Sequence, residues 1–212
     1  MEELITIGEN TTYTLVEKKS KFIANLIKIE NQIEAEKAIK DYKKKYHDAR
    51  HNCIAYRVIE GERTIEKSSD DGEPSGTAGA PMLNILQKNN LCNILIIVTR
   101  YFGGILLGTG GLVRAYSEAL TGAIEKAKKV SQKWGYYVEC NLDYSEFEKF
   151  QYYCKKNELE IINVKYLDKI VCKISMEDRK KNSFLSDINE KKTNIIDYKF
   201  FDKKLITINK IN

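Results

Sequence analysis

Several features are scarce in this chain, and each scarcity excludes a class of protein. It has 2 Pro and 12 Gly in 212 residues, and 42% of its residues are hydrophobic, which excludes collagen-like, low-complexity and disordered chains. The longest unbroken aliphatic run, Ile94 to Val98, is too short to cross a bilayer. The first residues lack the basic and apolar regions of a secretory signal. We therefore expect a folded, cytoplasmic protein with no membrane partner.

Disulfide bonds are not expected either. The cysteines are odd in number, lie far apart and form no Cys-x-x-Cys pair; they are Cys53, Cys92, Cys140, Cys154 and Cys172. This usage is typical of reduced thiols that fill a core. A length of 212 residues allows one large domain or two small ones. Either is long enough to bury a core without disulfides or a structural metal.

Charge is not concentrated in any part of the chain. Residues 1–134 hold 20 Lys and Arg against 17 Asp and Glu, and residues 135–212 hold 15 against 13, within a total net charge of +5. This mild and even excess permits nucleic-acid binding but does not require it.

The first 130 residues alternate between strand and helix patterns. We expect strands at 11–15, 20–29, 52–59, 63–67 and 93–98, and helices at 31–46, 80–88 and 112–130. Asn31 is expected to cap the first helix. The run 93–98 is almost continuously aliphatic, which is typical of a strand buried on both faces.

The remaining residues have a second rhythm. We expect strands at 135–142, 159–167, 169–176 and 195–208, and helices at 145–156 and 179–191, with Ser145 as the cap of the first. This βαββαβ order is that of a ferredoxin-like α/β sandwich. We therefore predict an α+β protein of two α/β-sandwich domains, residues 1–133 and 134–212, joined by a short linker within residues 131–136.

A glycine-rich segment between the buried strand and the long helix is the first candidate site. Its glycines free backbone N–H groups, and the helix start adds a positive dipole end, so the loop is suited to hold phosphate. Arg100 and Arg114 are suited to grip phosphate or carboxylate, and Tyr101 and Phe102 to stack on bases. The alternative is that the glycines only allow tight packing and the arginines pair with acids. The glycines are Gly103, Gly104, Gly108, Gly110 and Gly111, and they match neither a Walker A loop nor a plain Gly-x-Gly-x-x-Gly motif.

An acidic loop at residues 68–77 is the second candidate. Asp70, Asp71 and Glu73 lie within four residues and are suited to bind Mg²⁺ or to supply a general base. Asp-Gly and Glu-Pro-Ser-Gly are equally typical of turns, in which Asp and Ser bond to their own backbone. A structured loop that faces a partner is the alternative interpretation.

Both histidines lie near the end of the first helix. His47 and His51 have a spacing that suits a metal only on a continuous helix, and this segment spans a predicted helix end. We therefore predict no metal site. His51 is instead expected to be a polar binding or structural residue that bonds to the acidic loop.

Three longer motifs together resemble the IMPACT family in its bacterial, YigZ-type form. They are the segments 69–83 (SDDGEPSGTAGAPML), 98–104 (VTRYFGG) and 107–116 (LGTGGLVRAY), with further matches at 19–23 and 51–57. The resemblance implies a ribosomal-protein-S5-domain-2-like amino-terminal domain and a ferredoxin-like carboxy-terminal domain. It also implies a link to translation, with RNA or a ribosome-associated protein as the partner. We expect no cofactor.

Three functions follow from these observations. The first is RNA binding, with Lys21, Arg57, Arg100 and Arg114 on phosphates and Tyr101 or Phe102 on bases. The second is a Mg²⁺-dependent enzyme that acts on a phosphate ester through the glycine-rich loop, with catalytic candidates Asp70, Asp71, Glu73 and His51. The third is a protein-interaction module.

Overall fold

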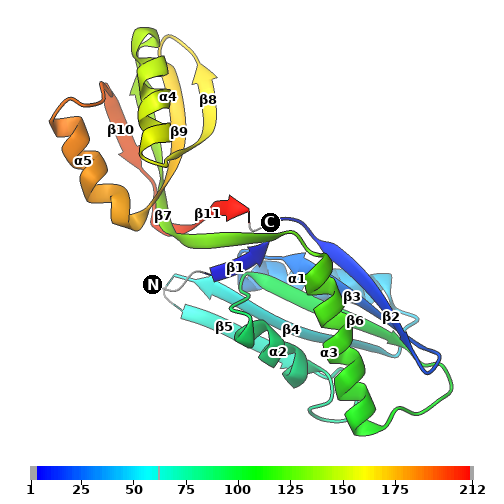
Figure 1. Cartoon of the computed structure of the whole chain (residues 1–212). Helices are drawn as coiled ribbons and strands as arrows, with labels where there is room; N and C mark the ends of the chain where they lie inside the picture. The colour runs from blue at the N-terminus through cyan, green and yellow to red at the C-terminus, as the bar shows by residue number, and fades with distance from the viewer. Residues whose placement is uncertain (1–3, 62, 211–212) are drawn as a thin grey trace. The chain divides into compact units, whose positions relative to one another are not determined.

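The computed structural model describes residues 4–61 and 63–210. The chain divides into two compact units, one that ends at Ser131 and one from Gln132 to Asn209. A five-stranded sheet lies within the first unit, three strands of another sheet lie wholly within the second, and each unit has its own helices (Figure 1). The protein is therefore an α+β protein of two domains.

The first unit is built on a five-stranded sheet in the order β2-β3-β6-β4-β5. All four neighbouring pairs are antiparallel. The strands predicted for this part of the chain are all present, as β2 (Thr11–Glu17), β3 (Ser20–Lys28), β4 (His51–Glu60), β5 (Arg63–Ser69) and β6 (Ile94–Tyr101).

Helices cover both faces of this sheet, and the central strand β6 shows why. Ile94, Ile96 and Val98 pack with residues of α2 (Gly79–Lys88) and α3 (Gly108–Lys126). Leu95 and Ile97, which alternate with them, pack with residues of α1 (Gln32–Lys45). Because every side chain of this run is buried, the aliphatic pattern has no polar positions. The prediction of a strand buried on both faces is confirmed.

The end of the long helix and the predicted linker are the main corrections. Helix α3 ends at Lys126 rather than at residue 130, and β7 (Lys129–Leu142) runs straight through residues 131–136. The segment predicted to hold the domain boundary is therefore part of a strand rather than a loop. A strand that we did not predict, β1 (Leu4–Ile7), pairs with β7, and the Gly8 N–H donates to the Lys128 carbonyl. This long-range pairing outweighs the helical spacing of Ala127 and Val130.

The second unit has the predicted order of elements. The strands β8 (Glu160–Tyr166), β9 (Ile170–Glu177) and β10 (Asp197–Phe200) join β7 in the order β10-β7-β9-β8, and each of these pairs is antiparallel. Helices α4 (Phe147–Lys156) and α5 (Lys181–Asn189) contribute Phe150 and Phe184 to its core.

Two details of the second unit differ from prediction. The single strand expected at 195–208 is divided into two strands, β10 and β11 (Lys204–Lys210). Both of them pair with β7. A short 3-10 turn at Tyr144–Glu146 precedes α4, which has no side-chain cap, so the predicted cap by Ser145 is wrong. The predicted Asn31 cap is confirmed, because its Oδ1 accepts the Glu34 N–H at 2.8 Å.

The state of the cysteines and the character of the helices agree with what the sequence predicted, namely free thiols in the core and no membrane-spanning segment. All five cysteines are free and buried. Within residues 4–61 and 63–210, no helix combines the length and the apolar character that a membrane span needs.

Candidate functional site

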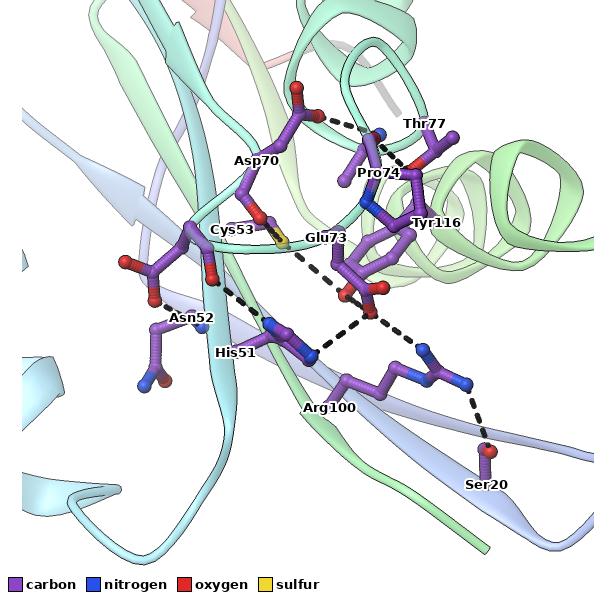
Figure 2. Close-up of polar contacts among 12 residues, drawn as sticks. Ser20, His51, Asn52, Cys53, Asp70, Glu73, Pro74, Thr77, Arg100 and Tyr116 are labelled. Carbon is purple, nitrogen blue, oxygen red and sulfur yellow. Dashed lines mark hydrogen bonds and ion pairs between the residues drawn. The ribbon is translucent and has the colours of Figure 1, made fainter. Parts of the chain in front are cut away.

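A buried polar cluster lies at one end of the first sheet and joins four segments of the chain. His51 opens β4 and pairs directly with Arg100 near the end of β6. Glu73 comes from the loop before α2, and Tyr116 comes from α3. The Glu73 Oε1 accepts hydrogen bonds from the Arg100 Nη1 at 2.7 Å and the Tyr116 hydroxyl at 2.9 Å, and lies 4.0 Å from the His51 Nε2 (Figure 2).

The two charged side chains of this cluster are almost completely removed from solvent, so their attraction is screened little by water. The side chain of Glu73 is 3% exposed and that of Arg100 is 7% exposed. The Arg100 guanidinium also contacts two aromatic rings, with its Cζ 5.4 Å from the Phe22 centroid and 5.6 Å from the Phe102 centroid. The Arg100 Nη2 donates to the Ser20 hydroxyl, whereas its Nε is buried and has no hydrogen-bond partner among the described residues.

The first acid of the acidic loop caps a helix. The Asp70 Oδ1 accepts the N–H groups of Ala78 and Gly79 at 2.9 and 2.8 Å, where α2 begins, and its Oδ2 accepts the Gly76 N–H at 2.8 Å. Burial raises the pKa of Asp70, but these three backbone donors outweigh burial and hold the pKa below its usual value. Asp70 thus organises the loop that carries Glu73.

The second acid ties the same loop to α1 and β4. The Asp71 carboxylate accepts the Lys43 Nζ at 2.6 Å and the Asn52 N–H at 2.7 Å, and its carbonyl lies 2.9 Å from the His51 Nδ1. The three acids therefore point to three different sets of partners. Among the residues that the structure describes, no three His, Cys, Asp or Glu side chains form a group that holds a metal.

Replacement of Asp70 by asparagine is expected to lower the free energy of unfolding by about 1–2 kcal/mol at neutral pH, because the helix loses a charged cap. The folded-state pKa of Asp70 is lowered, so its stabilisation is present above about pH 4 and is lost as the pH falls through the folded pKa. Urea unfolding from pH 7 to pH 2 should show the wild-type and Asp70→Asn curves converging in acid. Asp41→Asn, on the exposed face of α1, is the control and should change stability by less than about 0.5 kcal/mol. A constant difference at every pH would contradict the role of the charge.

A cavity of about 400 Å³ adjoins the buried cluster. One wall is polar and holds His51, Glu73 and Arg100, with the exposed Arg50 beside them. The other wall is the start of α3, with Leu107, Gly108, Thr109 and Leu112. The glycine-rich loop and the acidic loop thus face the same cavity.

The glycines of the loop have different roles. A Cβ on Gly103 would lie 2.0 Å from the carbonyl carbon of Lys19, so this glycine allows two backbones to pack together. Gly104 and Gly108 have φ values of +85° and +71°, where residues with side chains are strained. Gly110 faces open space. Part of the glycine pattern is therefore explained by packing and turning alone.

The cations and aromatics predicted to bind RNA do not form one surface. Arg100 and Phe102 lie at the cavity. Lys21 and Tyr101 pair with each other across β3 and β6, at positions that alternate with those of the buried Phe22 and Arg100, and the Tyr101 hydroxyl donates to Asp48. Arg57 lies six residues along β4 from His51, bonded to Glu66 and to the carbonyls of Leu86 and Leu91. Arg114 is exposed on α3.

Some residues of the site were missed by sequence reasoning. Tyr116, Arg50, Ser20 and Thr109 were not singled out as site residues. Tyr116 and Cys53 lie in the same network, with the Cys53 Sγ 3.3 Å from the Tyr116 hydroxyl. Burial raises the pKa of the Cys53 thiol to about 12, so it is protonated at neutral pH and is not a nucleophile.

Comparison with known proteins identifies the family. Residues 18–124 match the Impact N-terminal domain, and residues 140–191 match a domain of unknown function, DUF1949. The chain belongs to the IMPACT family. This two-part organisation is that of the bacterial YigZ/YvyE type, and the resemblance seen in the motifs is confirmed.

Several IMPACT family relatives match most of the chain. The member YvyE of Bacillus subtilis (strain 168) is 34% identical over 184 residues, which are 87% of this chain and 84% of YvyE. The member YigZ of Escherichia coli (strain K12) is 34% identical over 177 residues, which are 81% of this chain and 85% of YigZ. A hypothetical protein of known crystal structure aligns with a TM-score of 0.63 at 27% identity, over 99% of this chain and 98% of that one.

Proposed function

We propose that this IMPACT family protein acts in translation by binding RNA, alone or on the ribosome, through the cavity side of its first unit. Membership of the family supports the link to translation that its motifs imply. The chemistry of the site supports a ligand with phosphates, because cations lie at the cavity while the neighbouring acids are already paired with Lys43 and Arg100.

The single observation that carries this proposal is that two arginines of the first unit are exposed and unpaired. Arg50 and Arg114 are exposed and make no ion pair within the described part of the chain. Arg50 lines the cavity itself. Arginine binds phosphate with two parallel hydrogen bonds, so an unpaired arginine at the cavity and a second one exposed on α3 are suited to hold an RNA backbone.

The test is RNA binding as a function of salt. Wild-type protein is expected to bind single-stranded RNA with an affinity that falls steeply as the salt concentration rises. The reason is that arginine side chains that contact phosphates displace the counterions condensed on the RNA. The double variant Arg50→Ala and Arg114→Ala should bind more weakly, and its salt slope should fall by about 1.4, since each phosphate contact on a single strand contributes about 0.7. Fluorescence anisotropy and co-sedimentation with ribosomes measure both quantities.

Two outcomes would contradict RNA binding. One is a wild-type protein that binds neither RNA nor ribosomes at low salt. The other is an equal loss in the control variant Lys37→Ala and Lys88→Ala, which removes the same charge from exposed positions on α1 and α2 away from the cavity. The buried Arg100 is left intact in this test, since its removal would leave Glu73 without its ion-pair partner.

A protein partner is the second candidate, and one observation favours it. Phe102, Ile105 and Leu106 are 49%, 42% and 82% exposed in the loop beside the cavity. Exposed apolar side chains that lie together are typical of contact surfaces. If a ribosome-associated protein covers this loop, Leu106→Ser should abolish the binding of that protein while RNA binding persists.

The enzyme hypothesis receives less support from the same geometry. Asp70 and Asp71 are held by backbone donors and Lys43, and the carboxylates do not converge as a Mg²⁺ site requires. We also propose that the first unit has the ribosomal-protein-S5-domain-2-like fold and the second the ferredoxin-like fold. The order β10-β7-β9-β8 with antiparallel neighbours supports the latter.

A further inference from the structure

The cavity of the first unit is half open to solvent and is lined by a small number of polar groups. Its volume of about 400 Å³ lies within the range of small-molecule sites, about 300–1,000 Å³. His51 and Arg100 stand on one wall, and Gly108 and Thr109 at the start of α3 stand on the other. A ligand in this space would touch both walls at once.

The start of α3 has donors without a partner of the usual kind. The first N–H groups of a helix have no intrahelical acceptor. Asn31 supplies one at α1 and the Asp70 carboxylate supplies one at α2. At α3 the capping position is Leu107, which makes no side-chain cap, and the first turn holds no acid. A helix of 19 residues therefore presents its positive end to the cavity.

Arg100 is the second, independent observation. It is 6% exposed and lines the cavity, yet its buried Nε donates to no group among the residues that the structure describes. A buried donor without an acceptor costs about 1–3 kcal/mol. The half-exposed Phe102 ring, which also lines the cavity, lies against the same guanidinium.

We propose that this cavity binds a terminal phosphate monoester. Its oxygens would accept from the N–H groups at the start of α3 on one wall and from Arg100 and His51 on the other. The Glu73 carboxylate also lines the cavity, but its Oε1 is held by Arg100 and Tyr116. The phosphate would accept hydrogen bonds from N–H groups at the start of α3, as the Asp70 carboxylate does at the start of α2.

A monoester suits this site better than a diester within a strand. A terminal phosphate enters from one side and presents three free oxygens, whereas an internal phosphate must have the chain leave in two directions. A monoester also carries close to two negative charges at neutral pH, which suits a helix end beside an arginine. Two sources share this chemistry, namely the 5′ end of an RNA and a free mononucleotide. The first source rests on the proposed RNA binding, and the second does not.

The test compares three probes with the full-length protein. They are a short RNA with a 5′ phosphate, the same RNA with a 5′ hydroxyl, and adenosine monophosphate, all measured by isothermal titration calorimetry. If the cavity holds the end of an RNA, the 5′ phosphate should improve the affinity at least tenfold over the 5′ hydroxyl.

A substitution at Thr109 separates the cavity from the rest of the surface. Thr109→Asp places a carboxylate in the first turn of α3, where the helix dipole favours it, so the variant should fold and have an unchanged or higher Tm. Its charge should compete with the phosphate and abolish the tenfold preference. Thr109→Asn, which is neutral, should keep that preference. Thr121→Asp carries the same charge to an exposed position later in α3 and should also keep it.

Each outcome has one meaning. A phosphate preference that Thr109→Asp alone removes supports the cavity as the end-binding site of an RNA. Binding of adenosine monophosphate alone, lost in Thr109→Asp, supports the cavity but overturns RNA as the ligand. Equal binding of both RNAs overturns the cavity site and leaves the proposed function standing. No binding of any probe overturns the cavity site, and it overturns the proposed function as well if the protein also fails to co-sediment with ribosomes at low salt.

Discussion

Replacement of Arg100 by alanine is expected to lower the free energy of unfolding by about 3–5 kcal/mol, because it leaves a buried carboxylate without its cation. The Glu73 side chain is 3% exposed and Arg100 donates to it at 2.7 Å. The Tyr116 hydroxyl remains as a donor to Glu73, but it carries no charge. Thermal and urea unfolding at neutral pH measure the loss.

A double-mutant comparison shows whether the ion pair is the cause. Removing both charges with Arg100→Met and Glu73→Gln should recover at least half of the stability lost in Arg100→Ala, because no unpaired charge then stays buried and methionine refills part of the space. A double variant as unstable as Arg100→Ala would show that packing against Phe22 and Phe102, rather than charge, holds this end of the sheet together.

The second large effect is expected at Gly103. Its added Cβ would lie 2.0 Å from the Lys19 carbonyl carbon and 2.4 Å from the Ser20 nitrogen, and backbone atoms cannot move aside as a flexible side chain does. Gly103→Ala should therefore push the loop away from the turn before β3 and lower the free energy of unfolding by about 3 kcal/mol. It should also weaken the bond from the Gly103 N–H to the Ser20 hydroxyl.

Gly110→Ala, in the first turn of α3, is the matched control within the same glycine-rich segment. Its Cβ would meet no atom within 4 Å, and alanine is a better helix former than glycine by up to about 1 kcal/mol. Urea unfolding should thus show one glycine-to-alanine change that destabilises and another that is neutral or stabilising. Equal losses at both positions would mean that the glycines share one conformational role.

The sequence motifs identified the segments of the site but not the roles of their residues. The acidic loop, the glycine-rich loop and His51 do meet at one place, because β4 and β6 are neighbours and set His51 against Arg100. The motifs also suggested that Asp70, Asp71 and Glu73 act together, since they lie within four residues. Asp71 and Gly72 have positive φ values, and this turn sends the three carboxylates to a helix end, a lysine and an arginine. Such a local reversal of direction is not visible in residue order.

The residues predicted to contact RNA show the same limit. Alternation along a strand places Tyr101 and Arg100 on opposite faces, and a separation of six residues places Arg57 about 20 Å from His51 along β4. No motif in the sequence singled out Arg50. It belongs to the site because its side chain lines the cavity in the folded protein.

The amino-acid sequence by itself determined the α+β class, the two-part organisation, the family and most of the strands and helices, because periodic apolar residues and long ordered motifs are local properties of the chain. Only the tertiary structure decided where α3 ends, that residues 131–136 belong to a strand, and which charges are buried in pairs. These features depend on partners far apart in sequence, such as Gly8 with Lys128 and Glu73 with Arg100. The free energy of such pairings comes from burial and hydrogen bonding that no short segment makes alone.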